Sequence, residues 1–276
     1  MALSNFGVRT LVTAVGAPLI LYLSWRGGVL FLVFIEIITL LGLREFYALA
    51  ERKLAQPSLL LGRIGCIALG IILYYTERQY AGLSVAILIV LLVSAELFRN
   101  NGSALLNTAT ALLGVGYVGG LLNFLLLIRE LPKHRGLEYT IGGTWVVMLF
   151  VVIWVCDTAA YLFGSRFGKH TLFQRVSPKK TVEGAVAGLI FAMATAWICH
   201  LTFVQGLRLM DTLIIGLICG TIGQISDLAE SRFKRDAGVK DSSSLIPGHG
   251  GVLDRFDSEL LVAPITYVYL VLFLPS

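Results

Sequence analysis

Charged residues are scarce in this chain. Of its 276 residues, 14% are Asp, Glu, Lys or Arg, whereas 57% are hydrophobic and the mean hydropathy is +0.82. A soluble domain carries about a quarter charged residues, because these residues cover its surface. The composition therefore excludes a soluble globular domain and predicts an integral membrane protein.

Cysteines are few and follow no pattern typical of disulfides or metal sites. The four, Cys66, Cys156, Cys199 and Cys219, lie in apolar stretches without Cys-x-x-Cys spacing. They are typical of small buried hydrophobic residues, which argues against a disulfide framework and against a zinc site. The chain also lacks a low-complexity run and an internal repeat, so nothing marks a separate soluble domain.

Apolar runs of membrane-spanning length recur along the whole chain. A membrane helix needs roughly 20 apolar residues to cross about 30 Å of hydrocarbon. The segments that qualify are 7–25, 28–48, 58–75, 80–97, 104–128, 142–165, 181–204, 209–228 and 259–275. They predict an all-α, polytopic membrane protein with nine transmembrane helices. We expect an N-terminal transmembrane region over residues 1–140 and a C-terminal region with cytoplasmic loops over residues 141–276.

Lys and Arg are distributed unevenly between the two sides that nine spans define. The side of the N-terminus holds sixteen of them, including five in 166–180 and five in 229–258, and the other side holds six. Because cytoplasmic loops carry the excess of Lys and Arg, we expect the N-terminus and both large basic loops in the cytoplasm. The outer loop 129–138 is expected to be a solvated turn. Glu36 and Glu96, in the N-terminal half, are interpreted as packing residues.

The first polar block lies within the sixth predicted span. Asp157 precedes Arg166 on one helix, which at 1.5 Å per residue places it about 13 Å below the charged boundary. Tyr161 follows Asp157 at i+4 on the same face. A carboxylate at that depth is costly unless it faces a polar cavity. We therefore expect Asp157 and Tyr161 to line such a cavity, with a structural hydrogen bond inside the bundle as the alternative.

The second block, Ser177-Pro178-Lys179-Lys180-Thr181, directly precedes the seventh span. We expect Pro178 to stiffen a turn that places Lys179 and Lys180 at a helix N-terminus. Free N–H groups and the helix dipole favour an anion there. Taken alone, the two lysines are typical of ordinary cytoplasmic charge. Beside the other blocks they favour phosphate binding.

The third block occupies the end of the eighth predicted helix and the start of the ninth. If the eighth helix continues past the interface, Asp227, Ser231 and Lys234 fall at i, i+4 and i+7 and form one polar stripe. Asp254 and Asp257, at i and i+3, share one face at the start of the ninth helix. The spacing therefore predicts two acidic helix ends.

A glycine-containing turn, Pro-Gly-His-Gly-Gly at 247–251, separates these helix ends. Its backbone N–H groups can approach an anion closely, because the glycines carry no side chains. Mg²⁺ prefers one or two carboxylates together with substrate phosphates. Carboxylates from two helices, the glycine turn and the neighbouring Lys and Arg residues therefore predict a magnesium–polyphosphate site.

With these three blocks the sequence resembles the CDP-diacylglycerol synthases, also called phosphatidate cytidylyltransferases. The family pattern is Ser-x-apolar-Lys-Arg, four residues, Lys-Asp, then Pro-x-His-Gly-Gly-apolar-x-Asp-Arg-apolar-Asp, and it runs unbroken from Ser231 to Asp257. The stretches 157–164 and 177–184 match further family features. The family has glycine at the position of Ser226, where a serine would either crowd the metal site or supply a ligand or hydrogen bond. The resemblance implies the Mg²⁺-dependent reaction of CTP with phosphatidic acid, which gives CDP-diacylglycerol and pyrophosphate.

The resemblance also implies roles for individual residues. Asp227 and Asp254 are expected to bind Mg²⁺, and Asp257 is expected either to bind the ion as well or to contact one of its ligands. Lys234 and Arg255 complete the expected catalytic set, with Arg255 either bridging phosphates or pairing with an aspartate. The expected substrate contacts are Asp157, Tyr161, Ser177, Lys179, Lys180, Thr181, Ser231, Arg235, Lys240, Asp241, Pro247, His249, Gly250 and Gly251. His249 is expected either to donate to a phosphate or to stabilise the turn.

Two other functions stay open at this point. A CTP-dependent lipid-alcohol kinase of the dolichol or phytol type would release CDP instead of pyrophosphate. A membrane transporter would also combine many spans with buried acids, but it would leave the glycine turn unexplained. Nucleic-acid binding is not indicated, because the basic residues follow the membrane loops. The expected partners are CTP, phosphatidic acid and the lipid bilayer of the cell inner membrane. The sequence leaves undecided whether a second cation binds and whether the protein forms a homodimer.

Overall fold

The computed structural model describes residues 5–76 and 79–274, so Arg78, counted above on the outer side, lies outside the described residues. The chain is mostly helical and divides into two compact units. Unit 1 consists of Met1–Leu23, Gly27–Leu127 and Phe233–Phe256, and unit 2 of Ser24–Arg26, Ile128–Arg232 and Asp257–Ser276. The division at residue 140 stays a prediction.

Each of the nine predicted segments is helical. The helices are α1 (Asn5–Arg26), α2 (Gly28–Glu51), α3 (Leu59–Thr76), α4 (Ala81–Glu96), α5 (Ala104–Gly114), the π-helix η1 (Val115–Gly120), α6 (Phe124–His134), α7 (Tyr139–Phe167), α8 (Val182–Thr202), α9 (Leu209–Asp236) and α10 (Leu253–Phe273). The fifth predicted segment is thus broken into α5, η1 and α6. A polytopic helical protein is confirmed.

Fewer helices than expected are long and apolar enough to cross a membrane. Among the described residues these are α3, α7, α8, α9 and α10, and α5–η1 with α6, bent by 45°, would make a sixth span. Helix α4 is too short, with 16 residues. Helix α2 carries Glu36, Arg44 and Glu45 along its length. A search for long apolar stretches includes such a helix, because a few charged residues change the average hydropathy of the stretch only a little.

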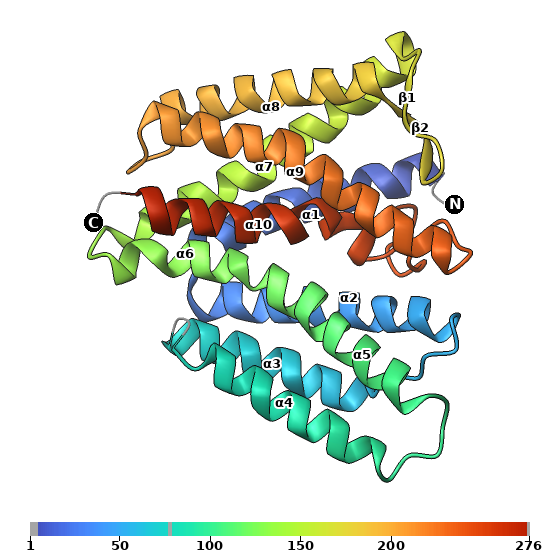
Figure 1. The fold of residues 1–276 in the computed structure, drawn as a ribbon. Coiled ribbons are helices and arrows are strands. Elements are labelled where there is room, and N and C mark those ends of the chain that lie inside the picture. The colour runs from blue at the N-terminus through green and yellow to red at the C-terminus, as the bar shows by residue number, and fades with distance from the viewer. Residues whose placement is uncertain (1–4, 77–78, 275–276) are drawn as a thin grey trace. The chain divides into compact units, whose positions relative to one another are not determined.

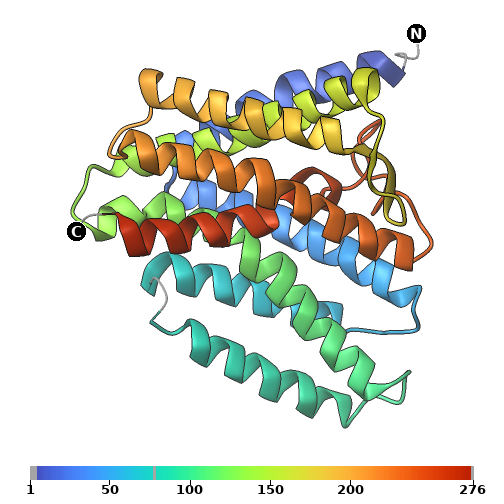
Figure 2. The same ribbon diagram turned by 45° about the horizontal axis from the view of Figure 1, so that its top comes forward.

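Unit 1 is built around α2, which contacts α3, α5 and η1, while α3 and α4 lie side by side (Figures 1 and 2). Tyr47 of α2 is buried, and its hydroxyl donates to the carbonyl oxygen of Ala111 in α5 at 2.9 Å. The last turn of α9 belongs to this unit as well. There the ring of Phe233 packs edge-on against Phe46 of α2 and Tyr117 of η1, with centroids 5.7 and 5.4 Å away.

Unit 2 is a stack of long helices in which α7 packs on α8 and α8 on α9 (Figure 1). Small residues allow the close approach. A Cβ at Gly184 of α8 would lie 2.6 Å from the carbonyl oxygen of Ala160 in α7, and one at Gly216 of α9 would lie 2.7 Å from the Cβ of Ala196 in α8. Membrane helices associate through such backbone contacts, because lipid offers no hydrophobic driving force between them.

Only the second half of the loop 129–138 is the solvated turn that the sequence predicts: residues 133–138 are mostly exposed, whereas residues 129–132 lie in α6 and are buried. Arg129 lies in α6 and is 1% exposed. Its guanidinium donates to the carbonyl oxygens of Ser24, Trp25 and Tyr139 at 2.8–2.9 Å and stacks over the ring of Tyr139. The last carbonyl groups of a helix generally have no partner within the helix, and a guanidinium with five donors can bind several of them.

A β-hairpin takes the place of the turn predicted before α8. Strand β1 (Thr171–Phe173) pairs antiparallel with β2 (Ser177–Thr181), so the fold includes one two-stranded sheet. Pro178 and both lysines of this block therefore lie in a strand, not at the helix N-terminus. Thr181 caps α8 by accepting a hydrogen bond from the N–H of Gly184 at 3.2 Å. Extended backbone before a proline is the favoured conformation, which suits a strand at this position.

Candidate active site

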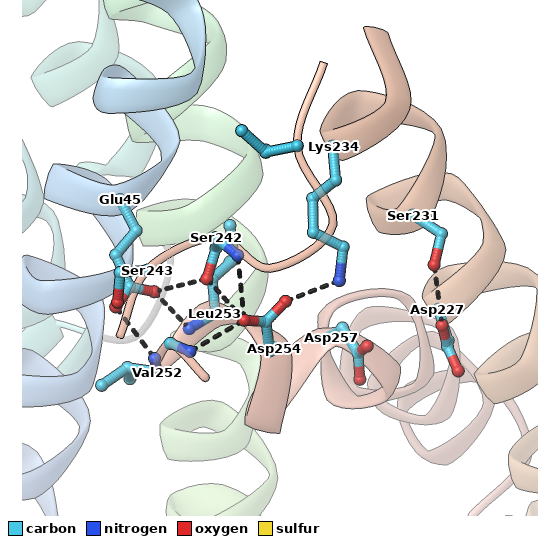
Figure 3. A network of polar contacts seen from close by, with 12 residues as sticks. Glu45, Asp227, Ser231, Lys234, Ser242, Ser243, Val252, Leu253, Asp254 and Asp257 are labelled. Carbon is cyan, nitrogen blue, oxygen red and sulfur yellow. Dashed lines mark hydrogen bonds and ion pairs between the residues drawn. The ribbon is translucent and has the colours of Figure 1, made fainter. Parts of the chain in front are cut away.

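Helix α9 carries the predicted polar stripe. The helix continues without a break to Asp236, which confirms that Asp227, Ser231 and Lys234 share one face. The hydroxyl of Ser231 donates to Oδ1 of Asp227 at 3.2 Å (Figure 3). On the other carboxylate oxygen, Oδ2, Asp227 forms an ion pair with Nζ of Lys180 from β2. Unit 2 thus brings together two of the three predicted blocks.

Acidic residues from three helices of unit 2 influence one another electrostatically. The carboxylate of Asp257 in α10 interacts electrostatically with Asp227 and Glu230 of α9, with Glu259 of its own helix and with Asp157 of α7. Three of the predicted site carboxylates therefore share one electrostatic environment. In the part of the chain that the structure describes, no group of three or more His, Cys, Asp or Glu side chains has the geometry of a formed metal site.

Ser226, the departure from the family pattern, forms a hydrogen bond between helices. Its side chain is fully buried, and its hydroxyl donates to the carbonyl oxygen of Asp257 in α10. The hydroxyl oxygen of Ser226 also accepts a hydrogen bond from the N–H of Leu261 at 3.3 Å. Of the roles considered for this serine, the structure shows the hydrogen bond, which joins α9 to α10 beside Asp257.

Asp254, at the start of α10, belongs to unit 1 and has donors on both carboxylate oxygens (Figure 3). Nζ of Lys234 lies 2.5 Å from Oδ1. Oδ2 accepts from the N–H and the hydroxyl of Ser242, at 3.0 and 2.9 Å, and from the N–H of Gly251 at 2.8 Å. Lys234 and Asp254 are 7% and 8% exposed, so this is a nearly buried ion pair.

The predicted glycine turn is present in the loop between α9 and α10. The N–H of His249 donates to the carbonyl oxygen of Ile246, and Gly248 has φ +76° at the third position after Pro247 at the second. Proline followed by a glycine with positive φ is the signature of a type II turn. Gly250 also has positive φ, at +86°. Glycine is favoured at these two positions because a side chain would strain the backbone.

The N–H groups that follow the turn bind carboxylates of the protein itself. The N–H of Gly251 donates to Asp254, whereas those of Val252 and Leu253 donate to Glu45 of α2 at 3.0 and 2.7 Å. The sequence predicts that backbone N–H groups here meet an anion, and in the structure the anions are these two side chains. His249 has its Nε2 3.2 Å from Oγ1 of Thr13.

Comparison with known proteins identifies the family of this chain. Residues 7–273 match the cytidylyltransferase family. This chain belongs to that family. The phosphatidate cytidylyltransferase of Staphylococcus saprophyticus is 32% identical over 272 residues, 96% of this chain and 98% of the relative. Those of Staphylococcus aureus and Staphylococcus epidermidis are also 32% identical, over 273 and 272 residues, with the same coverage.

Several of the predicted contact residues have side chains that other parts of this cytidylyltransferase family member do not cover. Tyr161 is 74% exposed. The others with exposed side chains are Asp157, Lys179, Arg235, Lys240, Asp241, Pro247 and Arg255. Arg235 donates to the carbonyl oxygen of Val239 at the end of α9 at 2.9 Å. Ser177, Lys180 and Thr181 are half-buried along β2. The structure brings Lys180 to Asp227.

Sequence reasoning missed Glu45. The N-terminal half of the chain was expected to contribute packing only, yet this buried carboxylate binds the segment that carries the family pattern. One signal was available: Glu45 is an acid in the apolar run of α2, and acids in such runs are costly unless they have partners. Its partners are about 200 residues away in sequence, so no spacing rule could find them.

Proposed function

We infer that this protein is a phosphatidate cytidylyltransferase, which joins CTP to phosphatidate and yields CDP-diacylglycerol and pyrophosphate. The relatives carry that name, and the likeness covers nearly the whole chain. The observation that carries the inference is the unbroken pattern from Ser231 to Asp257, folded as the end of α9, a type II turn and the start of α10. A polytopic helical protein suits this reaction, because the acyl chains of the lipid can stay in the bilayer.

The chemistry requires positioning more than proton transfer. The nucleophile is a phosphate monoester oxygen, which is largely ionised at pH 7 because its second pKa is about 6. No strong general base is then needed. The protein has to hold this oxygen in line with the α-phosphorus of CTP and to neutralise the leaving pyrophosphate. We propose that Lys180, which is paired with Asp227, and Lys234, which is paired with Asp254, contribute to this neutralisation.

The acidic residues of unit 2 fit a divalent cation. Asp227, Asp257 and Asp157 supply carboxylate oxygens, the donors that Mg²⁺ prefers, and their mutual repulsion favours a bound cation. We propose Asp227 and Asp257 as its ligands, and a bound Mg²⁺ would neutralise charge on the CTP phosphates. Asp254 was also predicted from the sequence to bind Mg²⁺. We do not include it in this ligand set, because its oxygens already accept hydrogen bonds from Lys234, Ser242 and Gly251. A second cation stays open.

We propose that the N-terminus and the active site face the cytoplasm of the cell. The excess of Lys and Arg on that side of the predicted topology, sixteen against six, supports this orientation. CTP is available in the cytoplasm, and phosphatidate presents its head group at the same interface.

The decisive experiment uses the purified protein in detergent with CTP, Mg²⁺ and phosphatidic acid. Formation of a CDP-lipid together with pyrophosphate is expected. In a parallel reaction with a lipid alcohol in place of phosphatidic acid, release of CDP together with the phosphorylated alcohol would instead identify a lipid kinase. Asp227→Asn should abolish turnover, and Asp236→Asn is a matched control, because Asp236 is exposed at the end of the same helix. Loss of activity in both variants would contradict the assignment of Asp227.

A further inference from the structure

Glu45 forms four hydrogen bonds with the segment that carries the family pattern, Ser231 to Asp257. It lies in α2 and is 5% exposed. Oε1 accepts from the hydroxyl of Ser243 at 2.6 Å and from the N–H of Val252 at 3.0 Å. Oε2 accepts from the hydroxyl of Ser242 at 3.0 Å and from the N–H of Leu253 at 2.7 Å. Four donors therefore surround one buried carboxylate (Figure 3).

The charge of Glu45 is offset by the start of α10. The N–H groups of Val252 and Leu253 are among those that a helix leaves without helical partners at its N-terminus. The dipole of α10, a helix of 21 residues, also favours a negative charge at this end. Glu45 thus caps α10 from a different helix, and it does so with a full charge, which makes these hydrogen bonds stronger than neutral ones.

The contacts of Glu45 lead directly to Asp254. The hydroxyl of Ser242 lies 3.0 Å from Glu45 and 2.9 Å from Oδ2 of Asp254, and since a hydroxyl has one proton it donates to one carboxylate at a time. The N–H groups of Ser242 and Gly251 also donate to Asp254. The same short segment is therefore held between two carboxylates, one from α2 and one from α10.

Gly251 shows how tightly this arrangement is packed. A Cβ at this position would overlap Oγ of Ser242 and would lie 2.5 Å from Oε2 of Glu45. Only glycine leaves room for the carboxylate of Glu45 to reach the backbone. The second glycine of the Gly-Gly pair thus has a physical reason in this structure, which is the close approach of Glu45.

We propose that Glu45 is a positioning residue for the cytidylyl transfer: it fixes the loop between α9 and α10, residues 237–252, and the first turn of α10. It touches no reacting atom in this role. Asp254 is held directly by the segment that Glu45 binds, and Asp257 follows one helical turn later on α10. Only the activity measurement below depends on the proposed function; the structural role of Glu45 can be tested without it.

The test compares Glu45→Gln with Glu51→Gln. A glutamine at 45 has one acceptor oxygen and turns an NH₂ group toward donors, so it cannot accept all four hydrogen bonds. Glu51 is in the same helix and exposed, which makes its replacement a matched control. Loss of an orienting contact typically costs 10- to 100-fold in activity. We expect kcat/KM to fall by about that factor for Glu45→Gln and to stay unchanged for Glu51→Gln.

Hydrogen exchange of the protein in detergent, without nucleotide or metal, provides a second measurement. The amides of Ser242, Gly251, Val252 and Leu253 should exchange at least about tenfold faster in Glu45→Gln, while amides in α7 and α8 keep their protection. Wild-type activity and exchange in Glu45→Gln would overturn the proposal. Loss of protection in α7 and α8 as well would also overturn it, because the role would then be general stability.

Two further variants keep the test decisive if Glu45→Gln does not fold. Glu45→Asp retains the charge and should recover part of the activity. Ser243→Ala removes one of the four donors and should give a smaller loss in the same direction. Full activity in Ser243→Ala together with an inactive, well-folded Glu45→Asp would contradict the shared network. If the wild-type protein does not convert CTP and phosphatidate, the proposed function fails, yet the exchange comparison still decides whether Glu45 holds the loop.

Discussion

The ion pair between Lys180 and Asp227 offers the sharpest test of the active site, because it should affect activity far more than stability. The side chains of Lys180 and Asp227 are 30% and 26% exposed. An ion pair that water reaches in this way contributes up to about 1 kcal/mol to stability. Asp227 also keeps its hydrogen bond from Ser231 when Lys180 is removed. We therefore expect Lys180→Ala to lower the melting temperature by no more than about 4 °C.

The expected loss of activity is much larger. A hydrogen bond from an ammonium group to a charged partner contributes about 1.5–3 kcal/mol. If Lys180 binds a substrate phosphate in the transition state, its loss should lower kcat/KM by about 10- to 100-fold, since 1.36 kcal/mol corresponds to a factor of ten. Lys180→Arg, which keeps the charge, should recover part of the rate.

Arg175→Ala is the matched control, because Arg175 is exposed between the two strands of the same hairpin. Pyrophosphate release would be measured for all three variants, together with thermal unfolding in detergent. The reasoning would be refuted if Lys180→Ala matched Arg175→Ala in kcat/KM. It would also be refuted if the loss of activity followed the loss of folded protein.

Three further predictions concern the packing of the site. Gly251→Ala should lower stability by about 1.5–3 kcal/mol, because the side chains of Ser242 and Glu45 must move and at least one charged hydrogen bond is lost; Gly82→Ala, where nothing lies within 4 Å, should not destabilise the protein. Ser226→Ala should cost about 1–2 kcal/mol in thermal unfolding, since the buried carbonyl oxygen of Asp257 loses its donor. Asp227→Asn should leave thermal unfolding nearly unchanged while pyrophosphate release stops, and retained release would contradict its role.

The helical elements followed from local features of the sequence. All nine apolar segments became helices, and α9 extends to Asp236 as its i, i+4, i+7 stripe predicted. The type II turn at Ile246–His249 followed from proline and glycine at adjacent positions. Such features depend on the residues within one or two turns of chain, so composition and spacing are enough to identify them.

The number of membrane spans and the β-hairpin were harder to predict from the sequence. Five or six helices in the described part of the chain are apolar enough to cross a membrane, against nine predicted. The strand Ser177–Thr181 was expected to be a turn at a helix N-terminus. Its pairing with Thr171–Phe173 depends on a partner strand that has no apolar alternation of its own. Short polar strands leave little trace in the sequence, because their stability comes from the partner.

By itself, the sequence determined a polytopic helical protein, the family pattern and the residue types of the site. Only the tertiary structure decided which of those residues have partners. Lys180 meets Asp227 across 47 positions, Arg129 meets the end of α1 across more than 100, and Glu45 meets Leu253 across 208. Contacts between distant segments depend on how whole helices pack, and a buried charge is stable only where that packing supplies donors. For this reason the sequence marked Asp254 as functional, and only the folded chain revealed that Glu45 of α2 holds the segment around it.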